Sequence, residues 1–190
     1  MVKFPTRTRK RGASMPIVAS LLVWLGLSNV IADIQCGVAK VDVSPVTLPA
    51  IQNGGFLEAL IQRNADPLHA RAMVFDDGAE KLAIVVVDSC MIPRDVCDQA
   101  KALAHEQTGI RTDRMLVSAT HTHAAPSVMD FCLGSRKDPA YTQYLPGKIA
   151  EAIVQAHAKL QPARIGFAVA DAGEFTKNRR WIRRSDRMVD

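Results

Sequence analysis

The clearest fold signal lies in the stretch His69-Ala-Arg-Ala-Met-Val-Phe-Asp-Asp-Gly-Ala-Glu-Lys-Leu-Ala-Ile-Val-Val-Val-Asp88. Two apolar runs, 69–75 and 81–88, flank Asp76-Asp-Gly78, and an Asp-Gly pair between apolar runs is typical of a β-hairpin. The second run is apolar throughout its middle, which predicts a central strand covered on both faces. The stretch therefore predicts two neighbouring strands in the interior of a sheet.

A helix and a further strand are predicted directly after this hairpin. Pro93 opens a segment whose apolar residues follow helical spacing, and Gly109 is a typical helix stop. Residues 115–119 then read as a strand. The order strand, helix, strand implies a right-handed parallel crossover.

The rest of the chain continues the alternation. Period-two patterns predict strands over 37–43 and 163–170, and we expect a short turn at 139–144 before a helix over 146–160. Residues 45–67 hold few periodic apolar residues and are expected to form a long loop. The predicted fold is α/β, with a mixed, largely parallel sheet and covering helices.

Composition and charge exclude several classes of protein. The 190 residues are 48% hydrophobic and 23% charged, which excludes collagen-like, coiled-coil and wholly disordered chains. The net charge of +5 comes entirely from residues 1–32, because basic and acidic side chains balance from Asp33 onward. We therefore expect no nucleic-acid partner.

The N-terminus reads as a targeting segment. A basic stretch through Arg11 precedes an apolar run over 17–27, and Val30 and Ala32 fit the small residues of a cleavage point. The apolar run is shorter than the roughly 20 residues of a membrane-spanning helix. The pattern predicts a signal peptide over 1–32, a domain over 33–190 and a secreted or periplasmic protein; an uncleaved anchor is the alternative.

The four cysteines admit two interpretations in an exported protein. Cys36, Cys90, Cys97 and Cys132 contain no C-x-x-C pair, so zinc-ribbon and thioredoxin-like sites are excluded. They are either small buried residues or include one disulfide. The pattern leaves both open.

The densest group of reactive residues is Ser118-Ala-Thr-His-Thr-His-Ala-Ala-Pro126, directly after a predicted strand. Histidines two residues apart on an extended backbone project to one face, so His121 and His123 can converge on a metal or an anion. The residues around the pair disfavour metallo-β-lactamase and amidohydrolase sites. A zinc site needs at least three protein ligands, so further ligands must come from elsewhere.

Other reactive residues have weaker support. His105 and His157 are expected on helices as structural residues, whereas His69 and Asp88 lie at predicted strand ends and can approach a site there. The basic segment around Arg179 is either a solvated charge run or an anion-binding group.

Five segments, in order, resemble the neutral/alkaline (non-lysosomal) ceramidases. They span most of residues 36–184 and are more specific together than the histidine pair alone. The segments are Gly37-Val-Ala-Lys-Val-Asp-Val-Ser-Pro45, Asp66-Pro-Leu-His-Ala-Arg-Ala-Met-Val-Phe-Asp-Asp-Gly78, Val85-Val-Val-Asp88, Ser118-Ala-Thr-His-Thr-His-Ala-Ala-Pro126 and Asn178-Arg179.

The resemblance implies a secreted zinc-dependent amidase that hydrolyses the N-acyl bond of ceramide to sphingosine and a fatty acid. It implies that His121 is a zinc ligand, that His123 lies beside the metal as the catalytic proton carrier, and that Arg179 binds substrate. The implied partner is a lipid-like N-acyl amide, with peripheral membrane contact. The implied fold is the N-terminal part of a larger catalytic domain.

Two departures qualify these expectations. Ceramidases usually have Ser-Gly-Pro after the histidine pair, where this chain has Ala124-Ala-Pro126, so the substrate pocket is expected to differ. The family's other zinc ligands, a His, a Glu and a Tyr, would fall beyond Asp190, so the chain alone is expected to be inactive. The alternatives are an exported lipid- or glycan-binding domain that uses residues 179–187, and a hydrolase of small amides.

Overall fold

A computed structural model describes residues 34–131 and 133–176 of the chain. The predicted signal peptide over 1–32, Cys132 and the segment around Arg179 lie outside the described residues. No helix in the described part combines the length and apolar character needed to cross a membrane.

The sheet has five strands in the order β6-β5-β4-β1-β7. The central strands β1 (Gln35–Asp42), β4 (His69–Asp76) and β5 (Lys81–Val87) are antiparallel neighbours. The hairpin predicted around Asp76-Asp-Gly78 is confirmed, with Gly78 at a positive φ of 85°. The edges are β6 (Met115–Ala119) and the two-residue β7 (Gln161–Pro162).

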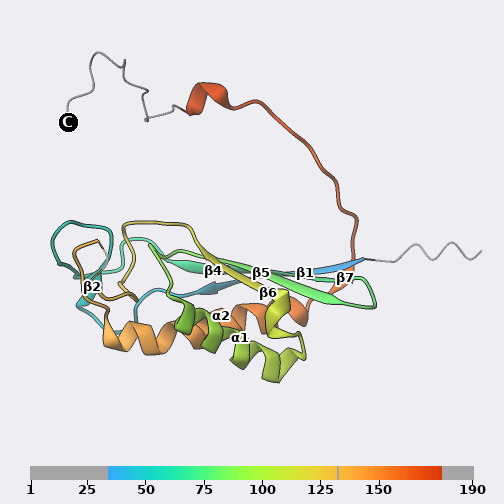
Figure 1. Cartoon of the computed structure of the whole chain (residues 1–190), viewed down its shortest axis with the longest axis horizontal. Coiled ribbons are helices and arrows are strands. Elements are labelled where there is room, and N and C mark those ends of the chain that lie inside the picture. Colours follow the sequence, from blue (N-terminus) through green and yellow to red (C-terminus); the bar gives the residue numbers. More distant parts are fainter. Residues whose placement is uncertain (1–33, 132, 177–190) are drawn as a thin grey trace, which may run out of the picture. The chain divides into compact units, whose positions relative to one another are not determined.

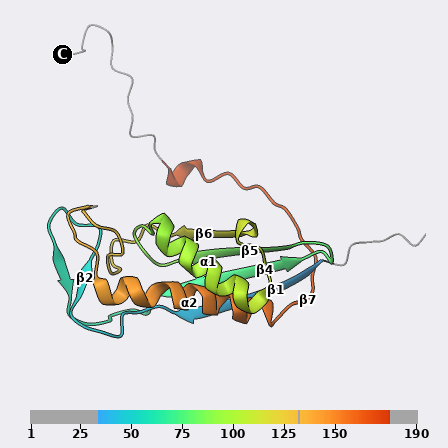
Figure 2. The same ribbon diagram turned by 60° about the horizontal axis from the view of Figure 1, so that its bottom comes forward.

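Two helices cover one face of this sheet, as Figures 1 and 2 show. They are α1 (Arg94–Thr108), which ends at the left-handed Gly109 as predicted, and α2 (Pro139–His157). Small side chains alternate along the covered face and let the helices approach closely. The core joins this face to both helices and includes Ala72, Val74, Ala83, Val85, Val87, Val96, Ala100, Leu145, Ile149 and Ile153.

The α/β class and the mixed sheet are confirmed, but the expectation of a largely parallel sheet is wrong. Among the described strands, β5 and β6 form the one parallel pair, across the crossover predicted through α1. The expectation that β5 is covered on both faces is also wrong. Leu82, which points away from the helices, is 41% exposed. An apolar run specifies burial but not the partner strand or the layer that provides it.

Two local predictions also need correction. The expected loop over 45–67 contains a small antiparallel pair, β2 (Ala50–Gln52) and β3 (Ala59–Ile61). The turn expected at 139–144 is helical, because α2 runs through Pro146. That proline removes one helical hydrogen bond, and burial of Tyr141, Leu145 and Ile149 around it stabilises the helix.

The strand expected over 163–170 is not formed. Regular pairing stops at Pro162, and one further hydrogen bond joins the Ala163 N–H to the Ile34 carbonyl. Phe167 is 95% exposed. Alternating apolar residues suit a strand, but a strand also needs a neighbouring backbone to pair with. Short 3-10 helices at Thr112–Arg114 and Gly173–Phe175 complete the described elements.

Candidate metal centre

The predicted site residues lie at one end of the sheet. Strands β5 and β6 both finish there, and β4 begins there because it is antiparallel to β5. His69, Asp88 and Thr120 are consequently neighbours at this edge: the Asp88 N–H donates to the His69 carbonyl at 2.8 Å, and the Thr120 N–H donates to the Val87 carbonyl at 2.9 Å. Topology thus brings three separate sequence segments to one place.

His121 is held by its backbone and by its ring. Its φ of 62° lies in the left-handed region, which non-glycine residues rarely adopt. Its Nδ1 lies 2.8 Å from the carbonyl oxygen of Cys90. Because a carbonyl only accepts hydrogen bonds, Nδ1 must carry the proton, and the lone pair of the neutral ring is on Nε2. This is the tautomer in which metal-binding histidines are commonly held, with the other ring nitrogen donating to a carbonyl.

His123 places its own Nε2 at 3.3 Å from Nε2 of His121. The two rings meet edge to face, with centroids 4.9 Å apart and an interplanar angle of 80°. Two nitrogen ligands of one tetrahedral zinc lie about 3.3 Å apart, as follows from Zn–N bonds of about 2.0–2.1 Å. Without an ion, the same approach is a hydrogen bond from the His123 Nε2–H to the His121 lone pair. The predicted convergence of the two histidines is confirmed, but the extended backbone from which it was predicted is wrong, because His121 has a positive φ.

The end of β2 and the residues that follow it contact the segment around His123. Gln52 Nε2 donates to the His123 carbonyl at 2.7 Å, and the Asn53 N–H donates to the Ala125 carbonyl at 3.0 Å. Gly54 follows and packs against the side chain of His123. The segment expected to be a long loop is therefore part of the framework of the site.

Cys90 completes a group of three residues that could hold a metal ion. Donor atoms of Cys90, His121 and His123 all lie within 4.8 Å of one another. The thiol is buried, and its Sγ lies 3.8 Å from Nδ1 of His121. Nδ1 of His121 already donates to the Cys90 carbonyl, so the main contribution of Cys90 is to orient the His121 ring. In this orientation Nε2 of His121 faces Nε2 of His123. This role of Cys90 could not be predicted from the sequence, because any residue type carries a backbone carbonyl.

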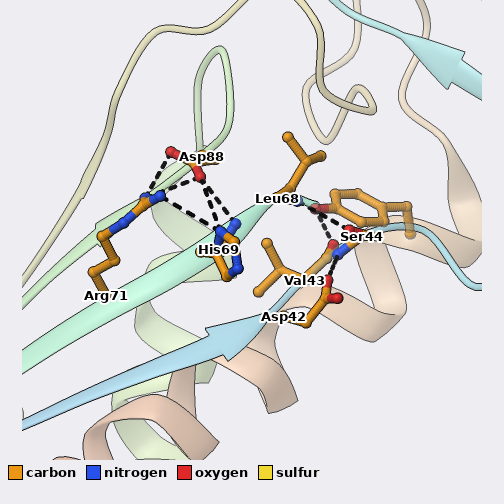
Figure 3. A network of polar contacts seen from close by, with 8 residues as sticks. Asp42, Val43, Ser44, Leu68, His69, Arg71 and Asp88 are labelled. Atoms are coloured by element: carbon orange, nitrogen blue, oxygen red, sulfur yellow. Dashed lines mark hydrogen bonds and ion pairs between the residues drawn. The ribbon is translucent and has the colours of Figure 1, made fainter. Parts of the chain in front are cut away.

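Asp88 directly follows β5 and binds two residues of β4, His69 and Arg71 (Figure 3). Its carboxylate accepts from Arg71 Nη1 at 2.9 Å and from the His69 N–H at 2.9 Å. Burial alone would raise the pKa of Asp88, but the hydrogen bonds from Arg71 and His69 outweigh it, so the pKa lies below its ordinary value. Asp88 is therefore a carboxylate at neutral pH and is bound to Arg71.

The remaining candidates have separate locations. His105 Nδ1 lies 2.8 Å from the Ile110 carbonyl next to α1, and His157 is the last residue of α2, so the expected helical positions of both are confirmed. His69 lies at the predicted strand end, where its Nδ1 is 3.9 Å from Asp88 Oδ2. Arg179 lies outside the described residues, so its substrate-binding role stays a prediction.

The other cysteines are only partly described. Cys36 and Cys97 are free thiols. Burial raises the pKa of the Cys97 thiol, which suits a structural residue on α1. Neither forms a disulfide, but both are half-buried, so the interpretation as small buried residues fits Cys90 and not these two. Cys132 lies outside the described residues.

Comparison with solved structures identifies the fold. No protein-family model matches the chain. The structure is similar to neutral ceramidase from Pseudomonas aeruginosa, with a TM-score of 0.61 and 24% identity over 68% of this chain and 22% of that chain. A ceramidase complexed with C2 matches with a TM-score of 0.53 and 22% identity over the same shares. The fold is ceramidase-like.

This likeness confirms the fold that the five sequence segments implied. At identities below 25% it establishes shared architecture, and the chain spans about a fifth of the length of each ceramidase, 22% in both cases. The α/β sheet that carries the histidine pair is thus an architecture that neutral ceramidases also have.

Proposed function

We propose that this chain is the N-terminal portion of an exported zinc-dependent amidase of the neutral ceramidase type, which hydrolyses the N-acyl bond of a ceramide-like lipid. One observation carries the proposal. Nε2 of His121 and Nε2 of His123 lie 3.3 Å apart, and the Cys90 carbonyl holds the His121 tautomer that leaves its lone pair free for a metal.

The donor set suits zinc. Imidazole nitrogens are typical zinc ligands, and a carbonyl that accepts from the far ring nitrogen orients such a ligand. By resemblance, His121 is the zinc ligand from this chain, and the proposal places the further His, Glu and Tyr ligands outside these 190 residues. When bound, zinc would polarise an amide carbonyl and lower the pKa of a coordinated water.

His123 suits the part of the proton carrier. Its ring is exposed, and its Nε2 faces Nε2 of His121, so a proton held there lies beside the reacting groups. The Gln52 side chain holds its carbonyl, and its ring is exposed at the surface of the described chain. A group that must both accept and release a proton benefits from such access. Arg179 is proposed, by resemblance, to bind the substrate.

Apolar side chains near the site support a lipid-like substrate. Phe56 is 96% exposed and Phe131 is 86% exposed. Their loops are joined because Gly134 packs against the backbone of Phe56 and Glu58 pairs with Arg136. Large exposed apolar side chains on joined loops are typical of surfaces that meet lipid or another apolar partner. The proposal also includes export of the protein by a signal peptide over residues 1–32 and peripheral contact with a membrane.

The binding-domain alternative rests on residues 179–187. Those residues lie outside the described part, so no structural observation favours the alternative over the amidase.

Zinc content tests the proposal. In protein purified from its source cells, we expect bound zinc and hydrolysis of a long-chain N-acyl sphingosine in preference to a short-chain N-acyl amine. His121→Ala should lose the zinc and the hydrolysis. His105→Ala is the matched control, because that histidine is bonded to Ile110 away from the pair. Equal zinc content in His121→Ala and wild type would overturn the ligand assignment.

A further inference from the structure

We propose that Asp88 is a positioning residue for His121: by binding Arg71 and the backbone of His69, it fixes the loop whose Cys90 carbonyl holds the His121 ring. This inference builds on the proposed function, because the oriented His121 is the proposed metal ligand. The carboxylate of Asp88 binds Arg71 and the His69 backbone, and its effect on His121 is therefore indirect.

The first step is the attachment of Asp88 to β4. Both carboxylate oxygens lie 2.9 Å from Arg71 Nη1, and Oδ2 also accepts from the His69 N–H at 2.9 Å. The backbones of the same two residues are also joined, because the Asp88 N–H donates to the His69 carbonyl. Charge-assisted hydrogen bonds to a largely buried carboxylate are stronger than neutral ones. Figure 3 shows Arg71 and His69 both directed at Asp88. The start of β4 and the end of β5 are thus joined at Asp88.

The second step leads from Asp88 to Cys90, two residues further along. Ser89 between them is fully buried, its N–H donates to the Val87 carbonyl at 2.9 Å, and its Oγ donates to the Met91 carbonyl at 3.2 Å. The loop therefore has little freedom between its attachment at Asp88 and the Cys90 carbonyl. A shift of Asp88 would be transmitted along this short, buried segment.

The third step leads from Cys90 to His121. The Cys90 carbonyl is the acceptor for the His121 Nδ1–H, at 2.8 Å. Without a well-placed acceptor, the Nδ1–H tautomer loses its advantage and the ring can rotate. His121 also has a left-handed backbone, so its ring depends on tertiary contacts for its direction. Groups that orient a metal-binding histidine in this way typically change metal affinity 10–100-fold when they are removed.

Asp76 offers a matched control at the opposite end of the same two strands. It accepts from the Gly78 N–H at 2.8 Å and pairs with Lys81 at 3.3 Å, so it too is a carboxylate that joins β4 to β5. It lies at the hairpin, away from the site. If Asp88 only stabilises the pairing of β4 and β5, its loss should affect stability, the His121 tautomer and metal affinity in the same way as the loss of Asp76.

The experiment uses Asp88→Asn, Arg71→Lys and Asp76→Asn in the 190-residue chain, with two measurements. Nitrogen-15 NMR of the metal-free protein reports the tautomer of His121, and Co²⁺ titration followed by absorption reports metal affinity. We expect wild type and Asp76→Asn to show the Nδ1–H tautomer. Asp88→Asn should give a mixture of tautomers and bind Co²⁺ about 10–100-fold more weakly. Arg71→Lys, which keeps the cation but loses the planar guanidinium, should fall between wild type and Asp88→Asn.

The outcomes separate the two proposals. If Asp88→Asn keeps the wild-type tautomer and Co²⁺ affinity while losing as much stability as Asp76→Asn, the positioning role is overturned. If Asp88→Asn does not fold, an unchanged tautomer in Arg71→Lys overturns it instead. If the wild-type chain binds no Co²⁺ but the tautomer still responds to Asp88, the positioning role holds, and the metal assignment is decided separately by the zinc content of His121→Ala in protein from the source cells.

Discussion

Gly54 packs against His123 so closely that a methyl group on Gly54 would overlap the His123 side chain. Its φ of 103° lies in a region that favours glycine. Both the backbone conformation and the contact therefore require glycine, and the position of the His123 ring depends on it.

Gly54→Ala should displace the His123 ring and break its contact with Nε2 of His121, which nitrogen-15 NMR of the two rings would report. Gly78→Ala is the control, because Gly78 also has a positive φ but has open space where its Cβ would lie. Both variants should lose stability, and Gly54→Ala alone should change the ring signals of His123. Unchanged His123 signals in Gly54→Ala would contradict the contact.

The left-handed backbone of His121 predicts an unusual order of stabilities. His121→Gly should be more stable to urea than His121→Ala by about 1 kcal/mol, because alanine retains the cost of a positive φ. At His105, inside α1, the order should reverse, with glycine less stable than alanine by about 0.5–1 kcal/mol. The same order at both positions would show that His121 does not hold this conformation in solution.

The pairing of Glu58 with Arg136 predicts an acid-dependent loss of stability. Hydrogen bonds from Arg136 lower the pKa of Glu58 to about 2. A carboxyl with a lowered pKa in the folded state stabilises the protein above its ordinary pKa of about 4.3 and loses that effect as pH falls toward the folded value.

Thermal unfolding measures this effect. Wild type should have a higher Tm than Glu58→Gln at pH 7, and the difference should vanish near pH 2. Because the pair is exposed, 1 M salt should also reduce the difference. A difference in Tm that is the same at pH 7 and pH 2 would refute the assignment.

Asp138 predicts a graded loss of stability at the start of α2. Its Oδ1 accepts from the Tyr141 N–H as the helix cap, and its Oδ2 accepts from the Ile51 N–H in β2, each at 2.9 Å. Asp138→Ala removes both bonds and should cost about 2 kcal/mol, toward the upper end for a lost cap. Asp138→Ser keeps a cap but cannot reach both partners. Its free energy of unfolding in urea should therefore lie between those of wild type and Asp138→Ala. Equal losses for serine and alanine would show that the cap contributes nothing.

Local patterns were sufficient for the elements whose signals are complete within a short window. The Asp-Gly turn predicted the β4–β5 hairpin, and Pro93 and Gly109 marked the limits of α1. Alternation predicted β1, and a short apolar run predicted β6. In each case the residues that define the element are also the residues that form it.

Pairing partners could not be predicted in the same way. Whether a strand is parallel or antiparallel to its neighbour depends on contacts far apart in sequence, so the largely parallel sheet was wrong. Residues 163–170 have a strand pattern without a paired neighbour beyond Ile34, and Pro146 is accommodated because surrounding side chains are buried. These outcomes depend on tertiary packing, which no local window contains.

The same distinction between local pattern and tertiary packing holds for the site. The sequence by itself predicted that His121 and His123 converge after a strand, but it did so from an extended backbone, whereas the structure brings the rings together through a left-handed backbone at His121. Only the tertiary structure decided which ring nitrogen holds the proton, since the acceptor is the backbone carbonyl of Cys90, 31 positions away. It also decided that Gly54 packs against His123 and that Asp88 binds Arg71 and His69. Residue type determines what a group can donate or accept, and folding determines what it meets.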